Sequence, residues 1–373
     1  MMNVLYISNL TGNLFAGPNN SVPAQIKAQS EFDNVFWYNL NNVKREEWKE
    51  CNCYNLKDLP SGRLKDLPVP FNRPDIVVIE EFYCFPFCKI ISDIQKNKIP
   101  YIIIPRSELT KNAQKRKRIK KTIGNMCYFK RFAKKASGIQ FLSLQEKKES
   151  GEKWNKNNFI ISNGIDIPSS KKINFSKEKI NASYIGRYEI YQKGLDILID
   201  AISNLQTDLR NSNFVLNMYG VDQEKTLEIL RKKIIEDNIS DLIKINNPVY
   251  SKEKKEALLN TDIFILTSRF EGMPMGVIEA LAYGIPCLVT KGTNMSEDVN
   301  NYNAGWTCDT STKKIEEQLE KIISEKDKFP IFGDNARKLS EKYSWKRIAQ
   351  ITHLEFERIL KNNKSTDNMV KFE

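Results

Sequence analysis

Hydrophobic residues in the first half of the chain gather in short runs bounded by turn-forming residues. Such runs predict buried strands at 3–8, 34–40, 75–80, 101–105, 138–143 and 158–162. The stretches between them, such as 21–32 and 88–98, carry apolar residues at helical spacing. Because strands that alternate with helices are typical of βαβ units, we expect a parallel, doubly wound sheet.

The same alternation returns after a polar interval. Further strands are predicted at 183–187, 214–220, 242–247, 262–268 and 286–290. A linker near 165–180 would then separate a domain at 1–168 from a second at 176–343, and 344–373 would form an amphipathic helix and a tail. The expected fold class is α/β, with two Rossmann-like doubly wound domains facing across a cleft and a C-terminal crossing helix.

Length and composition agree with this picture. A chain of 373 residues, 40% hydrophobic and 10% aromatic, favours two globular domains. Seven cysteines, an odd and small number, indicate free thiols in a reducing compartment. The opening "MMNVLYISNL" lacks the basic start of a signal peptide, and no apolar run approaches the roughly 20 residues of a spanning helix. We therefore expect a cytoplasmic protein.

Positive charge is concentrated in one segment. The formal net charge is +12, and 111–135 holds eleven Lys or Arg residues, while no Asp or Glu lies between Leu109 and Gln145. A helical face is predicted there from Ile119, Ile123, Met126 and Phe132. Such a basic amphipathic helix fits an anionic membrane surface, with a solvated basic face as the alternative. Nucleic acid is disfavoured because aromatic residues are not interleaved with the basic run.

Two carboxylates flank a glycine-containing stretch in "EGMPMGVIEALAYG". Glu271 follows a predicted strand, and Glu279 lies about one turn inside the helix that follows, which Gly284 would end. Helix N-termini favour phosphate, and Gly272 and Gly276 would allow the backbone to approach a ligand closely. Since carboxylates accept hydrogen bonds from adjacent hydroxyls, the pattern suggests a nucleotide sugar.

Two cations also lie between a predicted strand and the helix that follows it, in an earlier part of the chain. Arg187, next to Gly186, ends a predicted strand, and Lys193 precedes a helix, so both could converge on a diphosphate. The chain contains no Asp-x-Asp triplet. If a sugar is transferred from such a nucleotide sugar, fixed cations and a helix N-terminus would stabilise the departing nucleoside diphosphate in place of a metal. We therefore expect no metal and no other cofactor.

Four cysteines are candidate metal ligands. Cys51, Cys53, Cys84 and Cys88 lack the spacing of a common zinc site, so buried thiols are the expectation. The single histidine, His353, lies on the last predicted helix and is expected to be structural or solvent-facing.

The chain resembles the retaining glycosyltransferases of family 4, within the glycosyl transferases group 1, which have the GT-B fold. The resemblance rests on "TGNLFAGPNNS", "SNGID", "IGRYEIYQKG", "EGMPMGVIEALAYGIPCLVT" and "YSWKRIA", in order along nearly the whole chain. It implies that Arg187 and Lys193 bind the donor diphosphate and that Glu279 binds the ribose. It also implies that Glu271 binds the donor sugar, near the amides of Gly272, Met273 and Met275.

Further implications concern the first domain. Gly17 lies in a loop that resembles the one approaching the diphosphate and the acceptor. Many family members carry a histidine after the strand at 101–105, whereas this chain has Arg106, which would act electrostatically.

As a whole, the resemblance implies a retaining, metal-independent hexosyltransferase. Its partners would be a nucleotide-sugar donor and a saccharide or lipid-linked acceptor in bacterial surface polysaccharide synthesis, at the inner face of the plasma membrane. A nucleotide-sugar epimerase of the same fold and a basic nucleic-acid-binding protein are the alternatives.

Overall fold

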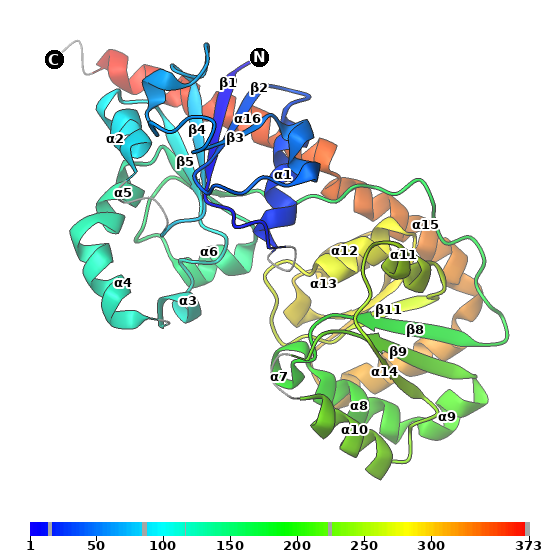
Figure 1. Ribbon diagram of the computed structural model, residues 1–373. Helices are drawn as coiled ribbons and strands as arrows, with labels where there is room; N and C mark the ends of the chain where they lie inside the picture. The colour runs from blue at the N-terminus through cyan, green and yellow to red at the C-terminus, as the bar shows by residue number, and fades with distance from the viewer. Residues whose placement is uncertain (14–16, 84–87, 116, 223–225, 370–373) are drawn as a thin grey trace. The chain divides into compact units, whose positions relative to one another are not determined.

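The computed structural model describes residues 1–13, 17–83, 88–115, 117–222 and 226–369. The chain divides into two compact units, Met1–Gly164 with Trp345–Glu373 and Ile165–Ser344 (Figure 1).

The first unit contains a parallel sheet in the order β3-β2-β1-β4-β5-β6-β7. Its strands are β1 (Asn3–Ser8), β2 (Asn34–Asn39), β3 (Cys53–Asn55), β4 (Ile76–Glu80), β5 (Tyr101–Ile104), β6 (Gly138–Phe141) and β7 (Asn158–Ile160). Its α-helices are α1 (Pro18–Gln29), α2 (Lys89–Lys96), α3 (Lys111–Lys115), α4 (Arg118–Gly124), α5 (Lys130–Lys135), α6 (Leu144–Ser150) and α16 (Trp345–Met369).

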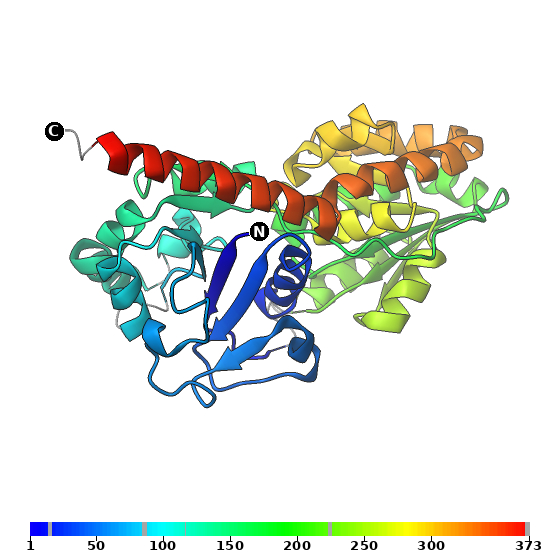
Figure 2. The ribbon, with the colours of Figure 1, turned by 90° about the horizontal axis from the view of Figure 1, so that it is seen from above.

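Helices cover both faces of this sheet because successive strand residues point to opposite sides. Val4 and Tyr6 of β1 pack in one cluster with residues of α1 and α16, including Phe356. Leu5 and Ile7 pack in the other cluster, with α2 and α5. In Figure 2 the long helix α16 runs along the first unit beside α1. The carboxyl-terminal helix is therefore part of the core of the first unit.

The sole histidine lies on α16 and has a structural contact. Its Nδ1 lies 2.9 Å from Oδ1 of the buried Asp33. The same aspartate accepts a hydrogen bond from the amide of Met2. His353 thus ties α16 to the segment between α1 and β2.

The second unit contains a parallel sheet in the order β10-β9-β8-β11-β12-β13. Its strands are β8 (Ile180–Ile185), β9 (Phe214–Tyr219), β10 (Ile243–Asn246), β11 (Ile263–Leu266), β12 (Cys287–Thr290) and β13 (Gly305–Cys308). Its α-helices are α7 (Ile190–Lys193), α8 (Leu195–Asn204), α9 (Gln206–Asn211), α10 (Leu227–Glu236), α11 (Ser251–Leu259), α12 (Met275–Ala282), α13 (Ser296–Asn301), α14 (Thr312–Ser324) and α15 (Phe329–Ser340). The strand order reverses between β8 and β11, which is where doubly wound sheets bind ligands.

The segment that follows the first unit is tied to the second. The amide of Ile165 donates to the carbonyl of Tyr343, and the amide of Lys172 donates to that of Tyr283. The ammonium of Lys172 also pairs with the buried Asp262 at 3.0 Å.

The predicted α/β class with parallel sheets is confirmed, and each predicted strand matches an observed one within a few residues. Two strands were missed, β3 and β13. Both are short edge strands, and their sequences, "CYN" and "GWTC", are too brief for a clear pattern. The strand predicted at 183–187 begins earlier, at Ile180, inside the polar interval.

The basic segment requires a correction. It is not one amphipathic face: α4 is followed by a π-helical turn, η3 (Asn125–Phe129), and then by α5. Because a π turn adds a residue to the helical repeat, it rotates the later side chains. Ile119 and Met126 are 79% and 78% exposed, whereas Phe132 is 1% exposed and stacks on Tyr101. Arg116 lies outside the described residues.

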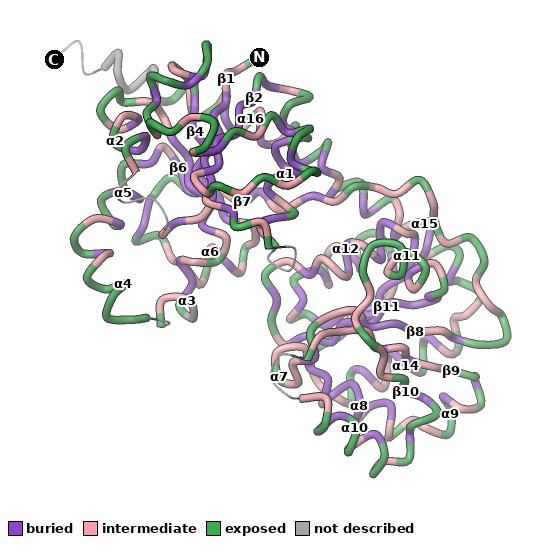
Figure 3. Tube along the Cα trace, in the orientation of Figure 1, coloured by how far each residue is buried: buried purple, intermediate pink, exposed green. Residues whose placement is uncertain are grey.

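Exposure along the chain follows the layers. Figure 3 shows buried strands in both sheets and an exposed α4. Among the described residues, no helix combines the length and apolar character needed to cross a bilayer. Of the four cysteines considered as metal ligands, Cys51 is buried, Cys53 and Cys88 are partly buried, and Cys84 lies outside the described residues.

Candidate functional site

An ion pair stands at the point where the strand order of the second unit reverses. Nζ of Lys193, at the end of α7, lies 2.5 Å from Oε1 of Glu271, which follows β11. The hydroxyl of Ser268 donates to the same oxygen at 2.7 Å. The two charged side chains are 13% and 8% exposed. The structure thus joins two residues that the sequence analysis proposed separately.

The close approach of these segments depends on Gly194. Its φ of +62° is favourable for glycine, and a Cβ here would lie 2.2 Å from the carbonyl oxygen of Thr267. The hydroxyl of Thr267 in turn donates to the carbonyl of Gly194 at 3.1 Å. A residue with a side chain would push Lys193 away from Glu271.

Arg269 makes a second connection between the loop after β11 and the segment around α7. Its guanidinium makes two hydrogen bonds of 2.7 Å to the carboxylate of Asp196, and it donates to the carbonyl of Tyr191 at 2.8 Å. Burial alone would raise the pKa of Asp196, but the hydrogen bonds and charge of Arg269 outweigh it and hold that pKa below its usual value. Sequence reasoning did not identify this pair, because nothing in the spacing indicates that Arg269 and Asp196 meet.

A third loop supports Glu271 through its backbone. Nδ2 of Asn294 donates to the carbonyl of Glu271 at 2.5 Å. Asn294 ends the short turn η4 (Lys291–Thr293) in the left-handed conformation, with φ of 60°. At Gly292 a Cβ would lie 2.2 Å from the carbonyl oxygen of Ser268. The loop that follows β12 is therefore fitted closely against the loop that carries Glu271.

Arg187 is more exposed than Lys193 and has other partners. Its guanidinium lies 3.2 Å from Glu189 and 3.4 Å from the amide oxygen of Gln192. Its carbonyl accepts a hydrogen bond from the hydroxyl of Tyr184 at 2.5 Å. A Cβ at Gly186 would meet the same hydroxyl at 2.8 Å, so glycine is required beside this bond.

Glu279 forms an ion pair with Lys254 of α11. Both side chains are 27% exposed. Lys254 was not proposed from the sequence as a site residue; it lies on α11, the helix that follows β10 along the chain. The structure places α11 next to the predicted ribose-binding residue.

The other predicted residues of "EGMPMGVIEALAYG" lie just before α12 or in its first turn. The amide of Met275 donates to the carbonyl of Met273 at 3.0 Å, which forms a turn before the helix. A Cβ at Gly276 would lie 3.1 Å from both the carbonyl of Ile185 and the ring of Phe264. Gly276 therefore lets α12 pack closely on β8 and β11. Gly272 directly follows Glu271 and is exposed.

In the first unit, Arg106 is engaged on every side. Its guanidinium pairs with Glu80 at 2.7 Å, and the two side chains are 5% and 0% exposed. It also donates to Ser21 at 3.0 Å and Gln25 at 3.1 Å, both on α1, and to Asn163 at 3.4 Å. The guanidinium thus connects β4, α1 and the segment after β7.

Gly17, the other predicted residue of the first unit, is the N-cap of α1. Its carbonyl accepts hydrogen bonds from the amide and the hydroxyl of Ser21. Among the described residues other than its chain neighbours, no atom lies within 4 Å of the position of a Cβ at Gly17. Leu14–Ala16, just before it, lie outside the described residues.

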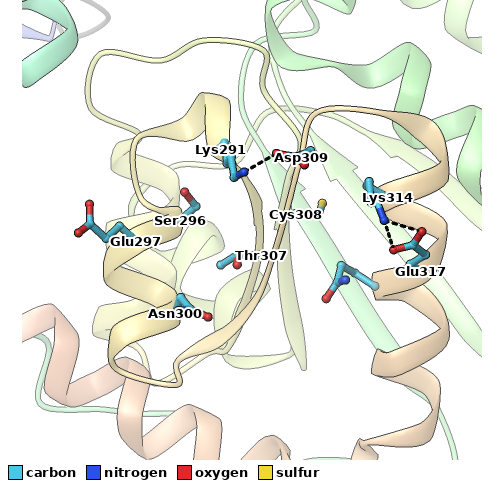
Figure 4. A pocket seen from close by; sticks show the side chains of 10 residues that line it. Lys291, Ser296, Glu297, Asn300, Thr307, Cys308, Asp309, Lys314 and Glu317 are labelled. Atoms are coloured by element: carbon cyan, nitrogen blue, oxygen red, sulfur yellow. Dashed lines mark hydrogen bonds and ion pairs between the residues drawn. The ribbon is translucent and has the colours of Figure 1, made fainter.

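A hollow of about 500 Å³ lies elsewhere in the second unit, at the carboxyl ends of β12 and β13 (Figure 4). Two ion pairs line it, Lys291 with Asp309 and Lys314 with Glu317. None of the predicted site residues is in its lining. The Lys193–Glu271 pair remains the candidate site, because it lies at the reversal of strand order, where doubly wound sheets bind ligands. Within the described ranges no cluster of His, Cys, Asp and Glu suited to a metal ion is found.

Comparisons with known proteins find similarity to glycosyltransferases. The family model described as glycosyl transferases group 1 matches residues 166–339. An uncharacterised glycosyltransferase of Methanocaldococcus jannaschii is 23% identical over 86% of this chain and 84% of its own length. The N,N'-diacetylbacillosaminyl-diphospho-undecaprenol alpha-1,3-N-acetylgalactosaminyltransferase of Campylobacter jejuni is 30% identical over 29% of each chain.

Solved structures give the fold. A glycosyltransferase from Rickettsia africae has a TM-score of 0.67 at 14% identity and covers 97% of this chain and 99% of its own. HepE from Anabaena, solved in complex with UDP, has a TM-score of 0.66 at 15% identity and covers 96% of this chain and 100% of its own. This similarity shows the GT-B fold that the sequence analysis expected.

Proposed function

We propose that this protein is a glycosyltransferase that moves a hexosyl group from a nucleotide-diphosphate sugar to a saccharide acceptor, because residues 166–339 match the family model of the group 1 glycosyltransferases. The observation that carries the proposal is the Lys193–Glu271 pair at the reversal of strand order. A cation and a carboxylate held side by side suit a ligand that has a diphosphate at one end and hydroxyls at the other.

Each charged residue then has a separate task. Lys193, with Arg187, neutralises charge that develops on the departing nucleoside diphosphate, and Glu271 accepts hydrogen bonds from hydroxyls of the sugar. Glu279 accepts the ribose hydroxyls, with Lys254 fixing its carboxylate. The amides of Gly272 and Met273 would face the sugar and phosphate, whereas the amide of Met275 donates to the carbonyl of Met273 and would serve by shaping the turn before α12.

Retention of configuration and independence from metal belong to the same proposal. The fixed cations and the N-terminus of α12 supply the positive charge that a metal would otherwise provide. Retention follows from the resemblance to family 4 and rests on that resemblance alone.

The first unit would hold the acceptor. Arg106 would act by positioning Ser21 of α1 and Asn163, because its guanidinium is fully engaged by protein groups. Gly17 would let the start of α1 approach the acceptor, since it has no side chain at the N-cap of that helix.

We also propose that the acceptor is lipid-linked, within surface polysaccharide synthesis. The name of the Campylobacter jejuni relative describes transfer to a diphospho-undecaprenol acceptor. In this chain, Ile119, Ile123 and Met126 are exposed between lysines and arginines of the basic segment. Apolar residues inside a basic surface suit an anionic bilayer, where each well-placed cation contributes about 1 kcal/mol.

The proposed activity is tested by incubating the protein in excess chelator with UDP-, GDP-, ADP- and CDP-sugars, with and without simple glycoside acceptors. We expect release of one nucleoside diphosphate, and transfer of the sugar to an acceptor detected by mass spectrometry. Conversion of a nucleotide sugar into an isomer without any acceptor would favour an epimerase. No turnover with any donor, with or without Mg²⁺, would contradict the proposal.

A further inference from the structure

Two aromatic side chains stand exposed beside the candidate site. Tyr191 of α7 is 68% exposed and Phe270, in the loop after β11, is 38% exposed. Their ring centroids are 6.4 Å apart, with the ring planes at 57°. Tyr191 lies two residues before Lys193, and Phe270 directly precedes Glu271. The aromatic pair is therefore carried by the same two segments as the ion pair.

The pair is held in place by its neighbours. The guanidinium of Arg269 lies 4.7 Å from the centroid of the Tyr191 ring and is itself fixed by Asp196. Nε2 of Gln192 donates to the carbonyl of Phe270 at 3.3 Å. Since a fixed side chain loses little further freedom on binding, such a pair is suited to bind a ligand.

The charges around the aromatic pair balance locally. Arg187 is paired with Glu189, Lys193 with Glu271 and Arg269 with Asp196, as their short distances show. With three cations matched by three carboxylates, this patch has no excess charge with which to attract an anionic membrane or a nucleic acid. Beside the cations proposed to bind the diphosphate, the two rings offer an apolar face to the uncharged sugar of the same donor.

We propose that Tyr191 and Phe270 form an aromatic platform that binds the sugar ring of the nucleotide-sugar donor. A pyranose carries hydroxyls around its edge and C–H groups on its faces. The electron-rich face of an aromatic ring attracts these C–H groups, while Glu271 accepts the hydroxyls. This inference rests on the proposed function, and it adds two residues that select the donor by its sugar.

The test is saturation-transfer difference NMR in excess chelator, with UDP-glucose, UDP-galactose, UDP-N-acetylglucosamine and GDP-mannose as probes. With the aromatic protons of the protein saturated, we expect strong transfer to the ring C–H protons of the bound sugar. Tyr191→Ala and Phe270→Ala should each weaken affinity for the intact nucleotide sugar about threefold to tenfold, the scale of one aromatic contact. Affinity for the free nucleoside diphosphate should be unchanged, which also shows that the variants fold.

Two further variants sharpen the result. Tyr191→Phe keeps the ring and should restore affinity for the nucleotide sugar. Tyr302→Ala removes an exposed aromatic residue at the end of α13 and should have no effect.

The possible failures are distinguishable. If the wild-type protein binds nucleotide sugars and both alanine variants bind them with the same affinity and the same transfer to sugar protons, the platform is refuted and the proposed function stands. If the wild-type protein binds none of the nucleotides, the proposed function fails and the platform fails with it.

Discussion

At the scale of single residues, the Lys193–Glu271 pair is difficult to explain as a stabilising contact, because removing two charges from water costs free energy. Both side chains are largely removed from water, with only 13% and 8% exposed. Desolvation of two charges often cancels their attraction, so a buried pair is weak evidence for a stabilising role. A role in binding explains the pair better, since Lys193 can bind the phosphate of a ligand and Glu271 can accept hydrogen bonds from its hydroxyls.

Loss of the lysine should therefore affect catalysis more than folding. We expect Lys193→Met to lower kcat/KM for the donor about 100- to 1,000-fold, the scale of one lost preorganised donor. Steady-state release of the nucleoside diphosphate measures this. Lys314→Met, which breaks the exposed pair with Glu317, is the matched control and should keep wild-type activity. Equal activity in the two variants would contradict the role of Lys193.

A pH-dependent stability is expected from Asp196. Burial acts to raise the pKa of this carboxyl, but the hydrogen bonds and charge of Arg269 have the larger effect and lower it. A carboxyl with a lowered folded pKa contributes stability above its unfolded pKa of about 3.9, and this contribution disappears as the pH falls through the folded value. Asp196→Asn should thus cost about 1 kcal/mol of unfolding free energy at pH 7, a figure reduced for partial exposure.

Urea unfolding at pH 7, 5 and 3.5 tests this. The difference between wild type and Asp196→Asn should be constant from pH 7 to 5 and shrink by pH 3.5. Asp208→Asn, at an exposed position on α9, should show no such trend. A difference independent of pH would mean that the charge of Asp196 contributes nothing.

At the scale of elements, the site is built by three loops that follow β8, β11 and β12. Glycines allow these loops to approach one another, most clearly Gly194 against Thr267 and Gly292 against Ser268. The sequence indicated the first two loops, because their charges lie at predicted strand ends. It could not indicate the third, since Asn294 acts through a hydrogen bond to a backbone carbonyl and carries no charge.

The close approach at Gly194 can be tested by comparing the stability of two glycine-to-alanine variants, one with a steric clash and one with backbone strain alone. An alanine at positive φ costs roughly 1–2 kcal/mol by itself. At Gly194 the added Cβ would also collide with the carbonyl of Thr267, so we expect a loss of more than about 3 kcal/mol in urea unfolding. Gly62→Ala is the control, because Gly62 has a similar φ of +60° and a Cβ there would meet only Cδ2 of Leu56, at an ordinary contact distance of 3.6 Å. Equal losses in both variants would show that the loops can relax.

The same scale shows what sequence patterns predict well. Long buried runs such as 76–80 and 263–266 predict central strands because both faces of a doubly wound sheet are covered. Contacts between distant residues are not encoded in such patterns. The Arg106–Glu80 and Lys254–Glu279 pairs join residues that are about 25 positions apart, and only the fold brings them together.

At the scale of the whole molecule, the charge is very unevenly distributed. The formal net charge is +12, and eleven of these charges lie in 111–135, which leaves +1 for the rest of the chain. The described part of that segment presents Ile119, Ile123 and Met126 to solvent. Its amphipathic pattern was partly wrong in the sequence analysis, because the π turn directs Phe132 into the core.

Vesicle binding should follow from this concentration of charge. We expect the protein to sediment with phosphatidylglycerol vesicles at low salt and to be released at about 0.5 M NaCl, where surface charges are screened. Replacing Ile119, Ile123 and Met126 together with Ser should weaken binding, whereas Ile229→Ser with Ile235→Ser, exposed on α10, should not. Retention of the triple variant equal to wild type would exclude insertion of these side chains.

The most direct test of the central claim is calorimetric titration of the protein with UDP, GDP, ADP and CDP in excess chelator. We predict that one nucleotide binds with a stoichiometry of one, and that Glu279→Ala weakens this binding at least tenfold while Glu297→Ala, on α13, leaves it unchanged. Absence of binding for all four nucleotides, both in chelator and with Mg²⁺, would contradict the assignment of a donor site to the second unit.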